Sequence, residues 1–428
     1  MTSDAYREAY VWIWLPGKTS PVVAGLLTAV GGTLVFNYGR SYLQRADAIP
    51  IYTPELPLRQ GQLPLPHGLN MPSSIRDAAP DAWGRRVIIN RTQGLKGNAA
   101  NQADLDELVY LLESGSDRIG ALDFQRSPSA YAPREGGTAS LDQLLRAAEA
   151  VEQGTPLPPD LALALQHGTS LGGARPKAQI ATNTQKLIAK FSSSTDVYSM
   201  VKAEFVAMRL AAKVGIQAAP VRLERALGKD VLLVERFDRE KAEGGWLRKA
   251  MVSALTLLEL DEMMARYASY EKLAEIIRHR FTRPSATLEE LFRRLVFNIL
   301  CGNNDDHARN HAAFWDGERL TLTPAYDICP QARTGNEATQ AMLITGDKRK
   351  SRLAVCLEAA PNFQLNAERA TAIIMDQVRV IRNSWQAVCD EASMPESDRR
   401  LLWRRQFLNP FALEGVPAEI SDAAREEA

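Results

Sequence analysis

The chain has 428 residues, 45% of them hydrophobic and 24% charged, so it is long enough for two or three folded domains. Its 51 basic and 51 acidic residues cancel, which excludes a long-range field favouring nucleic acid or an anionic membrane. The four cysteines form no Cys-x-x-Cys pair, which argues against a disulfide framework and a cysteine-rich zinc site. Charged residues precede any apolar run, unlike a signal peptide, and residues 21–36 are too short and glycine-broken to span a bilayer. We therefore expect a cytoplasmic protein that does not bind membranes.

The first 125 residues are typical of a small mixed domain. Residues 24–30 and 33–39 are β-type runs that flank Gly31 and Gly32, the composition of a tight hairpin. A helix is predicted to start at Pro80 or Asp81, and a second one ends near Gly115 before a loop and a strand. We assign residues 1–125 to an N-terminal domain.

Residues 126–139 indicate a linker, and Ser140 is a predicted cap for a helix over 141–153. Residues 167–191 predict a loop, a strand, a turn and a second strand. A helix over 201–215 stops at Gly215, and residues 221–240 add two strands. Residues 140–238 are therefore predicted to form a strand-rich lobe.

Helical patterns dominate after Glu240, over residues 251–267, 270–281, 287–302 and 366–392. We predict an α+β fold in which this mostly helical lobe, residues 239–428, follows the strand-rich lobe, with a cleft between the two.

Two lysines in the strand-rich lobe are candidates for binding phosphate. Gly172 and Gly173 precede a strand and would let main-chain N–H groups approach phosphate oxygens, with Lys177 as a point charge; a turn with a solvated lysine is the alternative. Lys190 interrupts an apolar strand, and Glu204 in the next helix is a possible partner. Such a strand lysine and helix glutamate hold the ATP phosphates in kinases, although an outward lysine on a solvated face would look the same.

The lobe boundary carries a candidate adenine site. A buried strand runs into Glu235, Arg236 and Phe237, whose main-chain N–H and C=O groups would be free to bond adenine. A phenylalanine at the position of Phe237 is more often a core residue than a residue that stacks on a ring.

The stretch CGNNDDHARNHAAF, residues 301–314, has the spacing of a kinase catalytic loop. Asp305 and Asn310 are separated by four residues, as in the pattern where the acid accepts the substrate proton and the amide binds metal. Asp327, seventeen residues further on, would be the second Mg²⁺ ligand. Asp305 is favoured over Asp306 because only Asp305 has the kinase spacing.

Zinc or phosphohydrolase chemistry is the alternative for this stretch. His307 and His311 lie four residues apart and would share one helix face. The intervening glutamate of H-E-x-x-H is missing, however, and no third ligand stands at a recognisable spacing. We therefore expect His307 to brace the loop near phosphate, with Asp306 and His311 peripheral.

Six motifs in one order resemble the HipA family of toxin kinases from type II toxin–antitoxin systems. They are SLGGARPK, LIAKF, AEFVAMRLAAKVG, LLVERFDR, GNNDDHARNHAAF and LTPAYDI, within about residues 165 to 335. DAWGRRVI and SGSDRIGALDF are similar to the N-terminal part of the same family. The resemblance implies an ATP- and Mg²⁺-dependent serine/threonine kinase with a two-lobed fold related to protein and phosphoinositide kinases.

The resemblance also implies a role for each candidate residue. Asp305 is similar to the catalytic base, and Ser170 matches a serine that family members autophosphorylate, with Thr169 adjacent. The remaining implied roles are metal ligation by Asn310 and Asp327, ATP binding by Lys190 with Glu204, phosphate binding by Gly172, Gly173, Ala174, Arg175 and Lys177 with His307 nearby, and adenine binding by Glu235, Arg236 and Phe237.

The resemblance implies two partners. One is a small helix-turn-helix antitoxin similar to HipB, and the chain would reach operator DNA only through it. The other is a protein substrate such as an aminoacyl-tRNA synthetase.

The chain departs from the family pattern in two places: Ala174-Arg175-Pro176-Lys177 replaces Ala-Gln-Glu-Lys, and WLRKAMVSALT replaces a Pro-Gln-Glu-Asp segment. The second departure lies towards the substrate side of the predicted cleft, so the identity of the protein target stays open. A catalytically weak co-repressor that acts with the antitoxin is the alternative function.

Overall fold

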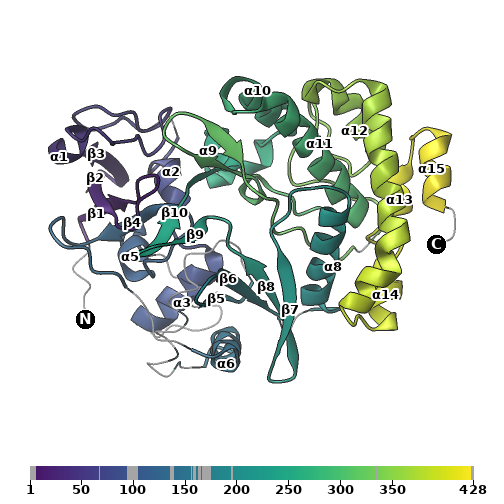
Figure 1. Ribbon diagram of the computed structural model, residues 1–428, viewed down its shortest axis with the longest axis horizontal. Helices are drawn as coiled ribbons and strands as arrows, with labels where there is room; N and C mark the ends of the chain where they lie inside the picture. Colours follow the sequence, from purple (N-terminus) through teal and green to yellow (C-terminus); the bar gives the residue numbers. More distant parts are fainter. Residues whose placement is uncertain are drawn as a thin grey trace. The chain divides into compact units, whose positions relative to one another are not determined.

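The computed structural model describes residues 6–66, 68–93, 105–134, 139–155, 157, 161, 165, 175–193, 196–333 and 335–425 (Figure 1). The chain divides into two compact units. The first comprises Met1–Ser193, Glu224–Val252 and Phe314–Glu318, and the second comprises Ser194–Leu223, Ser253–Ala313 and Arg319–Ala428. Within the described ranges no helix combines the length and apolar character needed to cross a bilayer.

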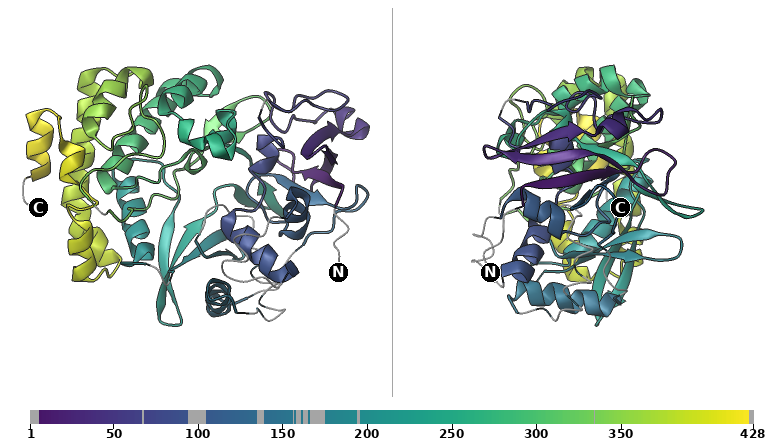
Figure 2. Two further views of the ribbon diagram at one scale, coloured as in Figure 1. Left: turned by 180° about the vertical axis from the view of Figure 1, so that it is seen from behind. Right: turned by 90° about the vertical axis from the view of Figure 1, so that its left-hand side faces the viewer.

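The first unit contains a four-stranded antiparallel sheet in the order β3-β2-β1-β4 (Figure 2, right). Its strands are β1 (Glu8–Ile13), β2 (Val22–Val30), β3 (Thr33–Tyr38) and β4 (Leu122–Gln125). Gly31 and Gly32 join β2 to β3 with φ of +57° and +83°, conformations that glycine adopts without strain. The predicted hairpin is therefore confirmed. The inner side chains of the sheet pack with α1 (Arg40–Leu43), α2 (Ser73–Arg76) and α5 (Glu107–Glu113).

A second sheet in this unit has the order β5-β6-β8-β7. Its strands are β5 (Lys177–Ala181), β6 (Lys186–Phe191), β8 (Lys229–Glu235) and β7 (Val221–Ala226), which begins in the second unit. Leu187, Ala189 and Phe191 of β6 are buried against α3 (Ala82–Gln93) and α6 (Leu141–Glu152). Because side chains alternate along a strand, Lys190 lies on the opposite, half-exposed face.

Helix α6 begins at the predicted cap. The Ser140 hydroxyl accepts from the Gln143 N–H, and the Gln143 side chain accepts from the Ser140 N–H at 2.8 Å, which completes a capping box.

Replacing Ser140 by Ala is expected to destabilise the first unit by about 1 kcal/mol, because an N–H group at the helix start loses its acceptor. The shift of the urea unfolding midpoint, followed by circular dichroism, measures this effect. Thr184→Ala, which removes an exposed hydroxyl in the β5–β6 turn, is the matched control. Equal midpoints for the two variants would show that the cap contributes nothing.

The chain after β8 differs from the sequence prediction. The hairpin of β9 (Arg239–Ala242) and β10 (Gly245–Arg248) was not predicted, and the expected helix over 251–267 is wrong. That stretch forms β11 (Ala250–Ser253), α9 (Ala254–Leu257) and the 3₁₀ helix η2 (Glu262–Tyr267). The cause is local: the Ser253 hydroxyl caps α9, and Glu259 adopts a left-handed conformation with φ of +55° that ends it.

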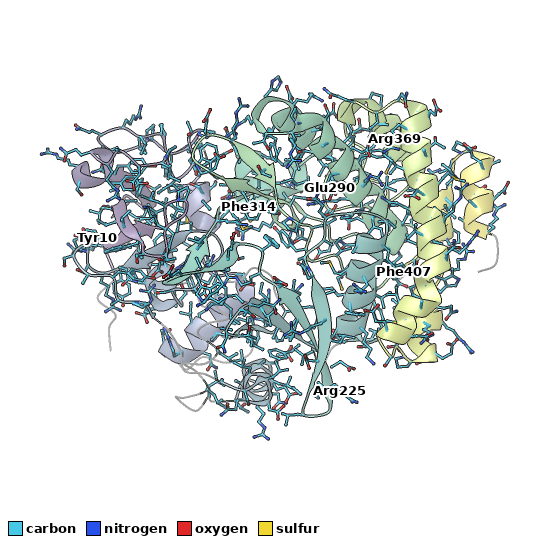
Figure 3. The ribbon with its side chains drawn as sticks, viewed as in Figure 1. Tyr10, Arg225, Glu290, Phe314, Arg369 and Phe407 are labelled. Atoms are coloured by element: carbon cyan, nitrogen blue, oxygen red, sulfur yellow. The ribbon has the colours of Figure 1, made fainter. Side chains whose placement is uncertain are left out.

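The second unit is mostly helical. Its main helices are α8 (Met200–Lys213), α10 (Tyr270–Arg280), α11 (Pro284–Cys301), α12 (Leu353–Ala359), α13 (Ala367–Glu391), α14 (Glu396–Leu402) and α15 (Ala418–Arg425). The helices predicted over 201–215, 270–281, 287–302 and 366–392 are confirmed. Helix α13 packs along α8 and α15 (Figure 1). The ring of Phe407, which is labelled in Figure 3, has its centroid 4.8 Å from that of the Trp385 ring on α13.

Short elements complete the second unit. They are the 3₁₀ helices η3 (Ala308–Asn310), η4 (Ala360–Phe363) and η5 (Pro410–Leu413) and the strand β13 (Leu320–Leu322). Strand β12 (Ala312–Trp315) lies where the chain passes into the first unit. The Thr323 N–H donates to the Ala312 carbonyl at 3.0 Å, which closes the hairpin-like segment expected between Asn310 and Asp327.

Candidate active site

The loop after α11 is held in place by its own main chain. Helix α11 ends at Gly302, where φ is +71° and a Cβ atom would lie 2.9 Å from Cα of Gln406, so only glycine fits. Beyond it, the Asn303 carbonyl accepts from Gln340 and the Asn304 carbonyl accepts from the Ala341 N–H, each at 3.1 Å. The following residues are therefore presented from a fixed support.

Asp305 and Asn310 lie together in this loop. Asp305 is an exposed residue whose carboxyl group is partly buried, and its main-chain carbonyl accepts from the His307 N–H at 2.8 Å and from Asn310 Nδ2 at 3.1 Å. Because the Asn310 amide nitrogen is used in that bond, its oxygen points elsewhere as an acceptor. No described residue donates to that oxygen, which suits a hard cation such as Mg²⁺.

Asp327 is carried to the same loop by its neighbours. The Ala325 N–H donates to the Gln217 carbonyl at 2.7 Å, and the Tyr326 hydroxyl donates to the Arg309 carbonyl at 2.7 Å. Asp327 itself has φ of +58°, a left-handed conformation that is uncommon for residues other than glycine. Strained conformations of this kind concentrate at functional sites because the surrounding contacts impose them.

The electrostatics show that the carboxylates share one small region. Partial burial raises the pKa of Asp305; His307 opposes this shift, and the negative charges of Asp327 and Asp306 add to it. A divalent cation at Asn310 and Asp327 would offset this repulsion, so the oxygen ligands present fit Mg²⁺.

Asp306 has a different environment from Asp305. It is buried, accepts a hydrogen bond from the Tyr270 hydroxyl, and its Oδ1 lies 2.9 Å from His311 Nε2. Burial opposes ionisation of Asp306, but the charge and hydrogen bond of His311 and the hydrogen bond of Tyr270 together hold its pKa below the usual value. We therefore assign a structural role to these contacts: they hold the loop in place through Asp306, His311 and Tyr270.

The zinc alternative does not suit this geometry. Residues 308–310 form a 3₁₀ turn, so His307 and His311 do not share a helix face, and His311 Nε2 is engaged by Asp306. Among the described parts of the chain, no group of three or more His, Cys, Asp or Glu side chains is arranged to hold a metal. His307 has a buried Nδ1 atom with no hydrogen-bond partner in the described residues, a position that a ligand oxygen or hydroxyl could fill.

The predicted phosphate loop is described only from Arg175 onwards; Thr169, Ser170, Gly172, Gly173 and Ala174 lie outside the described residues. Lys177 is buried in β5, and its Nζ lies 3.0 Å from Asp81 Oδ2. It stands directly opposite Lys190 of β6, so both lysines lie on the same face of the sheet. A phosphate at Lys177 would therefore share that ammonium group with Asp81.

The proposed lysine–glutamate pair draws on both units. Lys190 is half-buried in β6 of the first unit, and Glu204 is buried in α8 of the second. Their pairing stays a prediction.

The connector after β8 is less open than expected. The Arg236 N–H donates to the Lys186 carbonyl at 2.9 Å, so the prediction that this group is free is wrong: sheet pairing continues one residue past β8. The Glu235 side chain accepts from Gln185 at 3.0 Å, and the Phe237 ring packs edge-on against Phe314 at 5.9 Å. Adenine would therefore have to bind the remaining main-chain groups of the connector.

A buried charge network in the first unit was missed by the sequence analysis. Asp117 lies 3.1 Å from Arg236, 3.0 Å from Arg239 and 3.0 Å from Lys186. Both arginines also contact Asp238, at 2.8 and 2.9 Å. Burial opposes the charge on Asp117, but the surrounding cations, Arg236 first, hold its pKa well below the usual value.

The loop that carries Asp117 is also bonded to the connector through main-chain groups. The Arg118 carbonyl accepts from Arg236 at 2.7 Å and also from Arg239, and the Gly120 N–H donates to Asp238 at 2.9 Å. Asp117 and Arg236 are 119 residues apart in the sequence, so no local sequence pattern predicts their contact. The charged residues of the motifs SGSDRIGALDF and LLVERFDR were the available signal.

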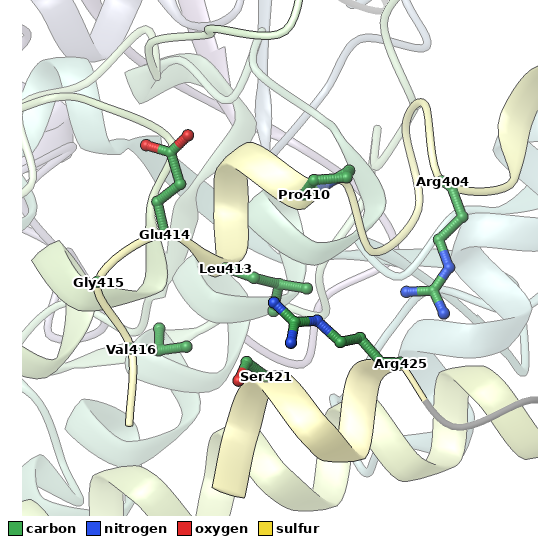
Figure 4. A pocket seen from close by; sticks show the side chains of 8 residues that line it. All are labelled: Arg404, Pro410, Leu413, Glu414, Gly415, Val416, Ser421 and Arg425. Atoms are coloured by element: carbon green, nitrogen blue, oxygen red, sulfur yellow. The ribbon is translucent and has the colours of Figure 1, made fainter. Parts of the chain in front are cut away.

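The second unit contains a pocket formed by residues near the end of the chain (Figure 4). Its volume is about 620 Å³, and it is lined by Arg404, Pro410, Leu413, Glu414, Gly415, Val416, Ser421 and Arg425. None of these is a predicted site residue, so this pocket does not mark the candidate active site.

Comparison with known proteins identifies the fold as that of a kinase-like α+β protein. The structure of the Shewanella oneidensis MR-1 toxin–antitoxin system of HipA, HipB and operator DNA matches with a TM-score of 0.68 at 19% identity, over 98% of this chain and 100% of that chain. This likeness confirms the predicted fold class.

The chain belongs to the HipA family. Residues 13–125 match the HipA N-terminal domain, and residues 169–385 match the HipA-like C-terminal domain. The Sinorhizobium fredii protein Y4mE is 26% identical over 342 residues, which cover 74% of this chain and 76% of Y4mE. The serine/threonine-protein kinase toxin HipA of Shewanella oneidensis is 26% identical over 185 residues, 37% of this chain and 42% of that protein.

Proposed function

We propose that the chain is an ATP- and Mg²⁺-dependent serine/threonine protein kinase and the toxin of a toxin–antitoxin pair. The observation that carries the proposal is the grouping of an exposed Asp305, an Asn310 amide oxygen without a donor among the described residues, and an Asp327 in a left-handed conformation. These are one proton acceptor and two hard oxygen ligands, the set that phosphoryl transfer to a hydroxyl requires.

In this proposal each group has one task. Asn310 and Asp327 hold Mg²⁺, which when bound neutralises charge on the phosphate oxygens. Asp305 orients the acceptor hydroxyl and takes its proton as the bond from the hydroxyl oxygen to the γ-phosphorus forms and the bond from that phosphorus to ADP breaks. Lys190, positioned by Glu204, holds the α- and β-phosphates, His307 bonds a phosphate oxygen, and the segment Gly172–Lys177 is assigned to phosphate binding.

Replacing Asp327 by Asn should raise the Mg²⁺ concentration needed for half-maximal transfer by at least about tenfold, since one charged ligand becomes a neutral one. Titration of Mg²⁺ in an ATP-hydrolysis or labelling assay measures this, and a chelator should abolish transfer by the native chain. Asp316→Asn, an exposed aspartate in the β12–β13 turn, serves as the control. Identical Mg²⁺ curves for the two variants would remove Asp327 from the metal site.

The proposed activity is tested by self-labelling. Purified protein, first treated with a phosphatase, is incubated with Mg²⁺ and ATP labelled in the γ-phosphate, and modified residues are located by mass spectrometry. We expect label at Ser170, lost in Ser170→Ala and kept in Thr169→Ala. Absence of any label on the chain and on added protein would contradict the kinase assignment.

We further propose a cytoplasmic location, a protein substrate, and a helix-turn-helix antitoxin partner that alone contacts DNA. The solved Shewanella complex contains HipA, HipB and operator DNA, which supports the partner by analogy. The domain limits 1–125, 140–238 and 239–428 are proposed with it. If the chain bound antitoxin and operator without any transfer activity, the co-repressor alternative would replace the kinase.

A further inference from the structure

The second unit exposes an unusual apolar patch. Seven large hydrophobic side chains are exposed among the described residues, and three of them lie within five positions of η2: Met263 is 83% exposed, Met264 45% and Tyr267 44%. No residue of η2 is buried, so packing against the core does not explain why large apolar residues occur in this helix. Clustered apolar exposure of this kind marks a binding surface more often than scattered single residues do. We call Met263, Met264 and Tyr267 the η2 patch.

The helix η2, which carries the patch, contacts the proposed catalytic loop through its first residue. Glu262, the first residue of η2, forms an ion pair with Arg309, which immediately precedes Asn310. The Arg309 carbonyl in turn accepts from the Tyr326 hydroxyl, the neighbour of Asp327. Arg309 therefore contacts η2 through its side chain and the segment of Asp327 through its main-chain carbonyl.

The opposite end of η2 adds positive charge. Arg349 Nη2 donates to the Arg266 carbonyl at 2.7 Å, and the Arg266 guanidinium lies over the Tyr267 ring at 4.9 Å. Neither arginine has a carboxylate partner among the described residues. An acidic group on a partner would thus find two cations beside an apolar surface.

We propose that the η2 patch docks the protein substrate of the proposed kinase. The occupant is a segment with an apolar side chain, which packs on Met263 and Met264, and an acidic residue, which reaches Arg266 or Arg349. The ion pair of Glu262 with Arg309 ties η2 to the loop that carries Asp305, the proposed proton acceptor for the serine or threonine of the docked protein. Flexible methionines suit a surface that must accept a side chain of varied shape. This inference rests on the proposed function, because it names how that site selects its substrate.

The test compares the native chain with a Met263→Ser/Met264→Ser double variant. Each purified protein is added with γ-labelled ATP and Mg²⁺ to a protein extract of the host whose own kinases have been inactivated by heat. Labelling of extract proteins and self-labelling are measured in the same reaction. Val197→Ser, which alters a side chain that is 79% exposed and lies outside the patch, is the matched control, and Met263→Leu/Met264→Leu should restore docking.

We expect the serine double variant to label extract proteins at least about tenfold more slowly through a raised KM, with unchanged self-labelling. Equal labelling of extract proteins by the native chain and the double variant would overturn the inference. A joint loss of self-labelling would also overturn it, since the patch would then support catalysis. Loss of antitoxin binding or of self-association, with extract labelling intact, would assign the patch to that other partner. A native chain that labels neither itself nor extract proteins would instead refute the proposed function.

Discussion

Replacing Asp305 by Asn is expected to slow phosphoryl transfer by about 10²- to 10⁴-fold while leaving the thermal unfolding temperature unchanged. Asp305 is an exposed residue, and the contacts through which it holds the loop come from its main-chain carbonyl, which Asn keeps. The change therefore removes the proton acceptor without disturbing its support. Initial rates of self-labelling, with ATP binding measured separately by calorimetry, provide the readout.

The neighbouring Asp306→Asn variant is the matched control. Asp306 is buried between Tyr270 and His311, so loss of its charge leaves the imidazole with a poorer partner and should lower the unfolding temperature. The two adjacent substitutions thus separate activity from stability. Near-normal transfer by Asp305→Asn would contradict the catalytic role assigned to Asp305. A stable but inactive Asp306→Asn protein would contradict the structural role assigned to Asp306.

The second large effect is expected at Asp117. Asp117→Asn leaves Arg236 and Arg239, each with a side chain only 1% exposed, without one of their two carboxylate partners. Removing one member of a buried ion network typically costs about 3–5 kcal/mol of unfolding free energy. Chemical denaturation of the variant measures this loss. Asp47→Asn, in an exposed pair with Arg45, is the control and should show no change.

The same network predicts a pH dependence. The pKa of folded Asp117 lies well below its unfolded value of about 4, so its stabilising contribution is complete above pH 4 and is lost as pH falls towards the folded pKa. The native chain should therefore lose stability between about pH 4 and pH 2 more steeply than Asp117→Asn. Parallel curves for the two proteins over that range would show that Asp117 is not paired in solution.

Elements with short-range signals could be predicted from the sequence. Gly31 and Gly32 fixed the first hairpin, and Ser140 fixed the start of α6, because each acts on its own chain neighbours. The failure at residues 251–267 has the same origin. The apolar residues of this stretch recur with a helical period. The Ser253 cap nevertheless starts a short helix, and the left-handed conformation of Glu259 ends it, so one continuous helix does not form.

The candidate site shows a similar limit. Asp305 and Asn310 could be proposed because their spacing lies within one short loop. The brace of Tyr270 under Asp306 spans 36 residues, and the contact of Asp117 with Arg236 spans 119, so only the fold reveals them. The hydrogen bond from the Arg236 N–H to the Lys186 carbonyl could likewise not be predicted, because it depends on how far the sheet pairing extends.

Phosphoproteomics after induced expression tests the central claim most directly, with the native chain compared with Asp305→Asn at equal protein levels. The kinase assignment predicts serine or threonine phosphosites that rise only with the native chain, together with phosphorylation of Ser170. Identical phosphoproteomes for the two proteins would contradict it.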